Sequence, residues 1–285
     1  MAPPKESIIN KRPIGITPVN ATGNILTDLP LIKSAGFDAT FFEWKEGETT
    51  ARMREADRLG LFVQSIHAPF CNSDGCPVST LWQEGAAGVA AANRLIACVK
   101  DCADHGIPVM VIHPFIGFKD HTPTAIGLEN YARVVEAAEK HGVKLGFENV
   151  EGEEYLAALM QHFWHSPACG FCLDTGHELC YNGGKDMLAL YGDKLCHTHF
   201  NDNLGVYDPT LTWENDLHLV PGDGIVDFAG VMARIAKTPY DGPILFELTL
   251  TNKPGRTDHD RYRAMGAEAF YRFAYERAIA AVTGK

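Results

Sequence analysis

Eight short apolar segments recur along the chain, and this repeat limits the folds open to it more than any other feature of the sequence. The segments are RPIGIT, FDATFFEW, LFVQSIHAPF, PVMVIHPF, VKLGFENV, CGFCLDTGH, LCHTHFND and PILFELTL. They are rich in the β-branched and aromatic residues typical of strands, and polar, alanine-rich stretches with helical periodicity follow them. The chain is therefore expected to alternate between strand and helix along its length.

The stretches between the apolar segments predict helices at 24–35, 48–60, 85–105, 125–141, 153–164 and 227–237. Several end before a glycine, which suits a left-handed helix cap. Continuously apolar strands separated by helices predict a parallel sheet, and closing eight strands into a barrel leaves no unpaired edge. We therefore expect an α/β fold, the (β/α)8 TIM barrel. The seventh repeat is the weakest, because residues 183–192 hold only a short helical stretch.

The 285 residues suit one domain, since α/β barrels commonly reach about 250 residues. No proline- or serine-rich linker and no change in composition marks a boundary, so residues 1–285 are predicted to form a single domain with a closing helix at about 257–283. That helix carries aromatic residues that either cover the barrel or serve a homo-oligomer contact (Tyr262, Phe270, Tyr271, Phe273).

The charge and the apolar content of the chain limit the kinds of molecule it is expected to bind. The chain has 25 basic and 36 acidic residues, a net charge of −11 that opposes attraction to nucleic acid. No apolar run approaches the roughly 18 residues needed to span a membrane, and the start, MAPPKESIINKRPIG, lacks a signal-peptide core. Eight irregularly spaced cysteines fit reduced thiols. We therefore expect a cytoplasmic protein without nucleic-acid or membrane partners.

Chemically active side chains gather at the carboxyl ends of the predicted strands, where barrels of this kind form their active sites. They are Glu43, His67, His113, Glu148, Asp174, His177, His199 and Glu247. Isolated buried charges cost several kcal/mol each, so this many at one rim would repel one another without a cation. A divalent metal removes that difficulty.

The segment HTHFND, residues 197–202, shows how a metal ligand would be placed. His197 and His199 point to the same face of a strand. We expect His199 to bind the metal, His197 to pack beside it, and Asp202 to orient the imidazole. Three carboxylates and one imidazole (Glu148, Asp174, Glu247, His199) make a mainly oxygen site for one divalent ion. We expect the bound ion to be Mn²⁺, with Mg²⁺, Co²⁺ and Zn²⁺ as the alternatives.

The motifs FENV, LDTGH, HTHFND, DLHLVPGDGIVDF and LFEL follow one another along the chain. In this order they resemble the xylose isomerase-like TIM barrels, a group with sugar epimerases, hydroxypyruvate isomerase, and inosose isomerases and dehydratases. The resemblance implies that Glu148, Asp174, His199 and Glu247 hold the metal. It also implies that His177 contacts the oxygens of the substrate. Ketohexose epimerases of the group have an arginine where this chain has Gly205, which argues against that activity.

The resemblance predicts a metal-dependent isomerase or epimerase that acts on a sugar or keto-polyol. Glu148 and Glu247 would transfer the proton through a metal-stabilised enediolate, and His177 would polarise the carbonyl. If a hydroxyl leaves instead, the same site belongs to a dehydratase or lyase, with His67 or His113 as the acid. A non-catalytic metal-bound barrel subunit is a further reading, which the presence of both glutamates disfavours.

The same barrel also occurs in endonuclease IV-type AP endonucleases, whose three-zinc cluster uses more ligands. That pattern falls on His67, His113, Asp216 and His218 in addition, with Glu148 bridging two metals. The loops that follow the strands hold one lysine and several acids, which favours a small molecule over DNA. The same residues then line a substrate pocket, together with Glu43, unless it pairs with Lys45, and Trp82, unless it packs on its neighbours.

Overall fold

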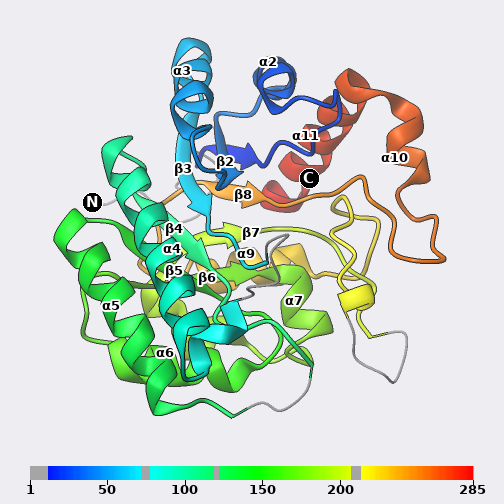
Figure 1. Cartoon of the computed structure of the whole chain (residues 1–285). Coiled ribbons are helices and arrows are strands. Elements are labelled where there is room, and N and C mark those ends of the chain that lie inside the picture. Colours follow the sequence, from blue (N-terminus) through cyan, green and yellow to red (C-terminus); the bar gives the residue numbers. More distant parts are fainter. Residues whose placement is uncertain (1–11, 72–77, 119–121, 207–212, 285) are drawn as a thin grey trace, which may run out of the picture.

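Eight parallel strands form the centre of the molecule. The computed structural model describes residues 12–71, 78–118, 122–206 and 213–284. All eight predicted strands are confirmed (Figure 1): β1 Ile14–Ile16, β2 Ala39–Glu43, β3 Phe62–His67, β4 Val109–Ile112, β5 Lys144–Glu148, β6 Cys169–Asp174, β7 Leu195–His199 and β8 Ile244–Phe246.

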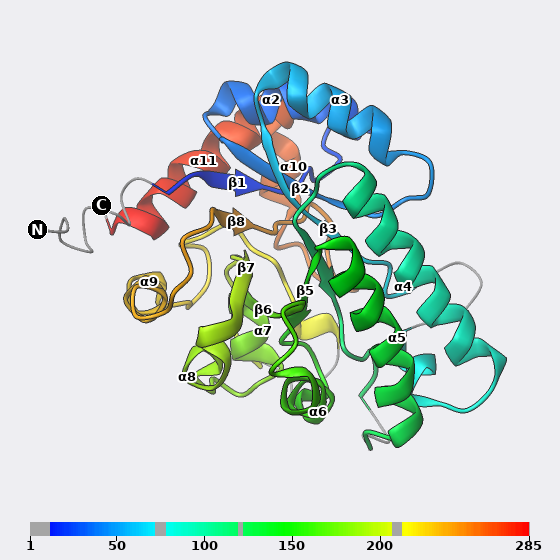
Figure 2. The ribbon, with the colours of Figure 1, turned by 90° about the vertical axis from the view of Figure 1, so that its left-hand side faces the viewer.

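The strands follow one another around a TIM barrel, as predicted. The hydrogen-bonded order runs from β7 down to β1 and then to β8, and β1 pairs with β8 through Ile14 and Ile244. Beyond the end of β7, the amide of Phe200 donates to the carbonyl of Leu245 (2.8 Å), and the amide of Glu247 donates to the carbonyl of Phe200 (3.0 Å). These two bonds join β7 to β8, so the barrel is nearly closed (Figure 2).

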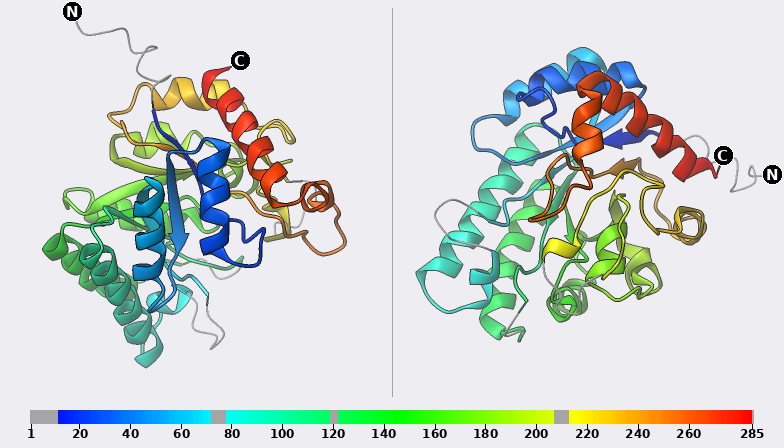
Figure 3. Two further views of the ribbon diagram at one scale, coloured as in Figure 1. Left: turned by 90° about the horizontal axis from the view of Figure 1, so that it is seen from above. Right: turned by 90° about the vertical axis from the view of Figure 1, so that its right-hand side faces the viewer.

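Helices surround the strands (Figure 3). They are α2 Ile25–Ala35, α3 Thr49–Leu59, α4 Ala86–Asp104, α5 Ala125–His141, α6 Glu153–Phe163, α7 Thr175–Cys180, α8 Met187–Tyr191, α9 Phe228–Ile235, α10 Asp260–Met265 and α11 Ala267–Thr283, with the 3₁₀ turns η1 Val78–Trp82, η2 Gly192–Lys194 and η3 Trp213–Asn215. The six predicted helices lie within two residues of these bounds. None of the described helices has the length and apolar character needed to cross a membrane.

The closing segment differs from the prediction of one helix at 257–283. Gly266 has a φ of 75°, which ends α10 and starts α11 as a separate helix. Tyr262, Phe270 and Tyr271 are buried. The Tyr271 hydroxyl donates to Asp28 (2.6 Å), whose carboxylate accepts amides of the loop before α2. These three aromatic residues therefore cover the barrel and are not free to form an oligomer contact.

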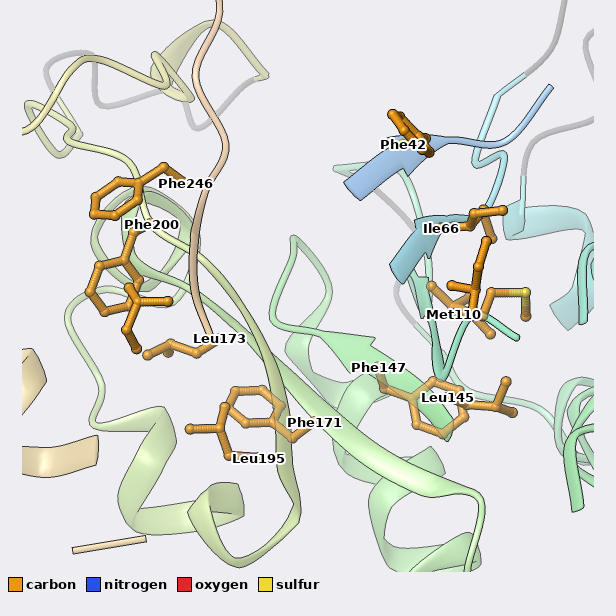
Figure 4. Packing of buried hydrophobic residues seen from close by; sticks show 14 of the residues in the cluster. Phe42, Ile66, Met110, Leu145, Phe147, Phe171, Leu173, Leu195, Phe200 and Phe246 are labelled. Atoms are coloured by element: carbon orange, nitrogen blue, oxygen red, sulfur yellow. The ribbon is translucent and has the colours of Figure 1, made fainter. Parts of the chain in front are cut away.

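Side chains alternate between the two faces of each strand, and this alternation sorts core residues from site residues. One set packs between strands and helices, including Phe42, Ile66, Met110, Leu145, Phe147, Phe171 and Leu173 (Figure 4). The other set fills the barrel, including Phe41, Val111, Cys172 and Leu245. A Cβ on Gly15 would lie 2.1 Å from a Leu245 methyl, so the interior is narrow there. The same alternation directs a group of polar side chains into the barrel: Glu43, Glu148, Asp174, His199 and Glu247.

Candidate active site

The inward-facing residues at the carboxyl ends of β5 to β8 bring together four side chains that could bind a metal ion. Glu148, Asp174 and His199 are the last residues of β5, β6 and β7, and Glu247 directly follows β8. Their ligand atoms all lie within 4.8 Å of one another. His199 Nδ1 lies 3.1 Å from Glu148 Oε1 and 3.2 Å from Glu247 Oε2. The four residues predicted to bind the metal therefore surround one point.

This set of donors fits a divalent cation. Glu148, Asp174 and His199 are fully buried, and carboxylates held this close repel each other strongly away from water. Glu148 Oε2 and His199 Nε2 have no hydrogen-bond partner in the part of the chain that the structure describes. Three carboxylates with one imidazole suit Mn²⁺, Mg²⁺ or Co²⁺, and they also accept Zn²⁺.

Two asparagines hold Asp174 in place. Asn149 accepts from the Asp174 amide (2.8 Å) and donates to its carbonyl (2.9 Å), while Asn201 Nδ2 donates to Asp174 Oδ2 (2.8 Å). Asp174 Oδ1 also caps α7 by accepting from the amide of His177 (2.7 Å). Neither asparagine was among the residues predicted for the site. The available signal was their place in the chain, one residue after Glu148 and two after His199.

Four imidazoles surround Glu148. Its Oε2 lies 3.4 Å from His67 Nε2 and 3.3 Å from His113 Nε2. Its Oε1 lies 3.3 Å from His177 Nδ1, besides the 3.1 Å to His199. Glu148 therefore joins the metal-binding cluster to the predicted substrate-binding histidines His67 and His113.

These contacts shift the pKa values of the cluster. Burial works to raise the pKa of Glu148, but the imidazoles of His199 and His113 outweigh it and hold that pKa well below its usual range. Burial lowers the pKa of His67, yet the Glu148 carboxylate overrides this effect and raises it to about 9. Burial dominates for Asp174 and raises its pKa to about 6. In the metal-free protein, the Glu148 carboxylate and the imidazole of His199 therefore favour each other's charged forms.

Asp216 and His218 extend the cluster on the side of His177. Asp216 Oδ2 lies 2.9 Å from His218 Nε2 and 3.4 Å from His177 Nε2. His218 has a φ of 49°, a conformation that costs a non-glycine residue about 1–3 kcal/mol. Its Nδ1 lies 3.0 Å from the carbonyl oxygen of Glu247, which fixes the ring. Backbone strain of this kind is common where a side chain must be held for function.

A cavity of about 1330 Å³ opens beside these groups at the carboxyl ends of the strands. Its polar lining includes Glu43, His67, His113, His177, Asp216, His218 and Glu247. Glu247 is 18% exposed, whereas Glu148, Asp174 and His199 are buried and do not line it. The cluster therefore lies below the floor of a cavity large enough for an organic substrate.

Known proteins share the fold of this chain. The family model described as "Xylose isomerase-like TIM barrel" matches residues 29–265. The chain belongs to the xylose isomerase-like TIM barrel family. The barrel is similar to a crystal structure of IOLI protein with a zinc atom, with a TM-score of 0.71 and 16% identity over 95% of this chain and 98% of that one.

Sequence relatives of this xylose isomerase-like barrel include dehydratases. It is 28% identical to the uncharacterized protein y4fM of Sinorhizobium fredii, over 88% of this chain and 86% of that protein. It is 24% identical to 3-dehydroshikimate dehydratase of Pseudomonas putida, over 82% of this chain but 37% of that enzyme. It is 28% identical to inosose dehydratase of Lactiplantibacillus plantarum, over 47% and 48%. Enzymes are therefore common among its relatives.

Two aromatic residues near the site, Trp82 and Phe115, lie outside the lining of the cavity. Trp82 is buried, donates from Nε1 to the carbonyl of Pro114 (2.8 Å), and does not line the cavity. The prediction that Trp82 binds substrate is therefore wrong. Phe115 is also buried and stacks on Tyr155 with ring centroids 4.0 Å apart. Both rings pack the loops behind the site.

Glu43 lies in the cavity wall, where a substrate-binding residue is expected. Lys45 does not pair with it, because Lys45 forms an ion pair with Glu48 instead. Three further polar residues of the wall were not predicted. Glu151 is buried and accepts from the amide of Gly117 (3.0 Å), and Tyr181 and Lys253 also face the cavity. No spacing in the sequence separates these residues from ordinary loop residues.

His197 packs beside His199, as predicted, with ring centroids 4.9 Å apart. Asp202 does not orient His199, so that prediction is wrong. Its Oδ2 accepts from the amides of Gly222 (2.7 Å) and Gly224 (2.9 Å), and its Oδ1 accepts from the amide of Val226 (2.9 Å). Asp202 therefore holds the turn that precedes α9.

Asp202→Asn is expected to lower the free energy of unfolding by about 1.5–3 kcal/mol. The new amide group would place a donor against glycine amides that need an acceptor. Urea unfolding measures the loss, and Asp241→Asn, a change at an exposed aspartate, is the matched control. Metal content should stay unchanged. A variant with the stability of the parent would contradict this role of Asp202.

Proposed function

We propose that this protein is a divalent-metal-dependent dehydratase of keto-polyols, with isomerisation as the alternative outcome of the same first step. The observation that carries the proposal is the position of Glu148. One oxygen of this carboxylate, Oε1, contacts His199 of the metal-binding cluster. The other, Oε2, contacts the imidazole of His113, which lines the cavity. Metal-binding and proton-transfer groups are thereby coupled at the floor of one cavity.

A bound metal ion would be held by Glu148, Asp174, His199 and Glu247, and it would supply Lewis acidity to substrate oxygens. Glu247 is the carboxylate of this set that lines the cavity, so it is placed to accept the proton α to a carbonyl. Glu148 is buried beneath it, which favours a supporting role over direct proton transfer. The proposal therefore assigns the base to Glu247.

His113 is the proposed acid for the departing hydroxyl. It lines the cavity, and its Nε2 lies 3.3 Å from Glu148 Oε2. Its Nδ1 has no hydrogen-bond partner among the residues that the structure describes. The ring lines the cavity beside the Glu148 carboxylate, so it is placed to donate a proton to the hydroxyl that leaves as water. His177 and His218 line the same cavity and would hold the carbonyl and neighbouring hydroxyls.

The relatives support dehydration over isomerisation. Two of them are dehydratases, and one of these carries the name of an inosose, a keto-polyol. Several imidazoles in excess of the metal ligands also supply an acid separate from the base, which loss of water requires. Gly205 replaces the arginine of ketohexose epimerases, which disfavours epimerisation.

The test is incubation of the Mn²⁺-loaded protein with an inosose in D₂O, followed by NMR. Exchange of the α-proton for deuterium, seen by NMR, reports the first step. A new ultraviolet absorbance of an enone reports loss of water. Exchange with loss of water supports the dehydratase. Exchange with a rearranged ketone would support an isomerase, and no exchange with any keto-polyol would refute both.

A phosphodiesterase of the endonuclease IV type is the second candidate, because further residues converge as metal-binding groups. His67, His113 and Glu148 offer ligand atoms within 4.8 Å of one another, and so do Asp174, His177 and His218. Against it, every lysine or arginine known to line the cavity is paired with a carboxylate. Parts of the loops that follow the strands (72–77, 119–121 and 207–212) lie outside the described residues.

A further inference from the structure

We propose that the natural substrate is a keto-polyol that carries an aromatic group, as in a ketone derivative of an aryl glycoside; this inference rests on the proposed function. The first observation is size. The cavity holds about 1330 Å³, whereas sites for small molecules usually span about 300–1000 Å³. A single sugar ring at the floor would leave much of this space unfilled.

The second observation is the chemistry of the remaining wall. It is formed by apolar side chains from several loops, including Val19, Leu26, Phe42, Phe118, Trp213 and Leu248. Leu26 is 37% exposed and Trp213 is 52% exposed. The hydroxyls around the edge of a free sugar would lack partners where they meet such a wall. A flat apolar group covers the same wall and removes it from water.

Trp213 also lies close to the reacting end of the cavity. The Lys253 ammonium is 4.9 Å from the centroid of the Trp213 ring and 3.9 Å from Asp216 Oδ2. Asp216 in turn contacts His177 and His218 on the floor. Lys253 therefore links the apolar wall to the polar floor. One substrate could therefore stack an aromatic ring on Trp213 while its polyol contacts His177 and His218.

The charges of the cavity exclude a phosphate as the second group. Three cations line the described part of the cavity. Lys45 and Arg52 both pair with Glu48, and Lys253 lies by Asp216. Glu43 and Glu151 add negative charge to the wall. An anionic tail would meet carboxylates and paired cations here, so the second group is neutral.

The experiment compares three probes by calorimetric titration of the full chain, with and without Mn²⁺: phenyl β-D-glucopyranoside, D-glucose and phenol. We expect the glycoside to bind at least tenfold more tightly than either part. Trp213→Ala should weaken glycoside binding by about tenfold and leave D-glucose binding unchanged, since an aromatic contact contributes on this scale. Leu190→Ala, at a residue 54% exposed and outside the cavity, is the matched control.

The outcomes separate this inference from the proposed function. If D-glucose binds as tightly as the glycoside, the aromatic group has no site, and the dehydratase proposal still stands. Equal weakening of both ligands by Trp213→Ala would also overturn the inference. If no probe binds with or without Mn²⁺, while inososes do exchange their α-protons, the glycoside alone is refuted. Absence of both binding and exchange would refute the two proposals together.

Discussion

Glu247→Gln is expected to lower kcat by about 10²–10⁴-fold while the barrel stays folded. Glu247 is the metal-binding carboxylate that lines the cavity, and its Oε2 lies 3.2 Å from His199 Nδ1. The amide keeps an oxygen for the metal but cannot accept a proton from carbon. The loss should therefore fall on proton transfer, and it should persist at saturating Mn²⁺.

The measurement is α-proton exchange in D₂O at saturating metal and substrate, together with metal content. Glu268→Gln, on the outer surface of α11, is the matched control and should retain full activity. Normal exchange by Glu247→Gln would remove this residue from the proton-transfer step. A circular dichroism spectrum and melting temperature like those of the parent would show that the loss is not unfolding.

Glu148→Gln distinguishes the two glutamates. Glu148 is fully buried and contacts four imidazoles, so the amide should disturb metal binding as well as activity. We expect this variant to keep its fold, to bind less metal, and to lose the reaction. If it instead binds metal normally and loses exchange more severely than Glu247→Gln, Glu148 is the base and the roles are reversed.

The barrel was predictable because its signals are local. Each strand is marked by its own apolar residues, and alternation along the strand fixes which side chains face inward. Glu148, Asp174 and His199 end successive strands in the sequence, and parallel strands bring those ends to one edge. Residue type and position in the strand were therefore enough to predict that these side chains come together.

Loop residues were harder to predict, because their partners come from other loops. Trp82 is buried partly because α5 has a glycine beside it, since a Cβ on Gly127 would lie 2.0 Å from the indole. Asp202 binds amides about twenty residues further along the chain. Neither contact follows from periodicity. The same holds for Lys253, which is identified as a wall residue only by its contacts with Trp213 and Asp216.

Removal of metal by a chelator is expected to abolish turnover, and addition of Mn²⁺ should restore it. Metal bound to the native state alone also stabilises the fold, by about 2.7 kcal/mol at a hundredfold excess over Kd. The melting temperature should therefore fall on chelation and recover with the ion. Activity that survives complete removal of metal would contradict the proposed role of the cluster.

The pH dependence of rebinding follows from the imidazole in the cluster. Burial lowers the pKa of His199, but the carboxylates of Glu247 and Glu148 outweigh burial and raise it above its usual value. The metal-free protein therefore holds a proton on His199 more tightly than a free imidazole does, and a metal ion must displace any proton bound there. Metal affinity should rise as pH rises toward that pKa. Calorimetry in buffers of different ionisation enthalpy should detect the released proton.

The number of metal ions per chain distinguishes the two candidate functions. The metal content of His218→Ala is expected to differ most clearly between them. His218 contacts Asp216 and lies outside the set of Glu148, Asp174, His199 and Glu247. A keto-polyol enzyme with one metal should keep that ion in His218→Ala and lose it in His199→Ala. If the protein is a three-metal phosphodiesterase, the unsubstituted protein should hold three ions, and His218→Ala and His199→Ala should each hold fewer. Mass spectrometry of metal content on untagged protein therefore tests the dehydratase proposal before any substrate is known.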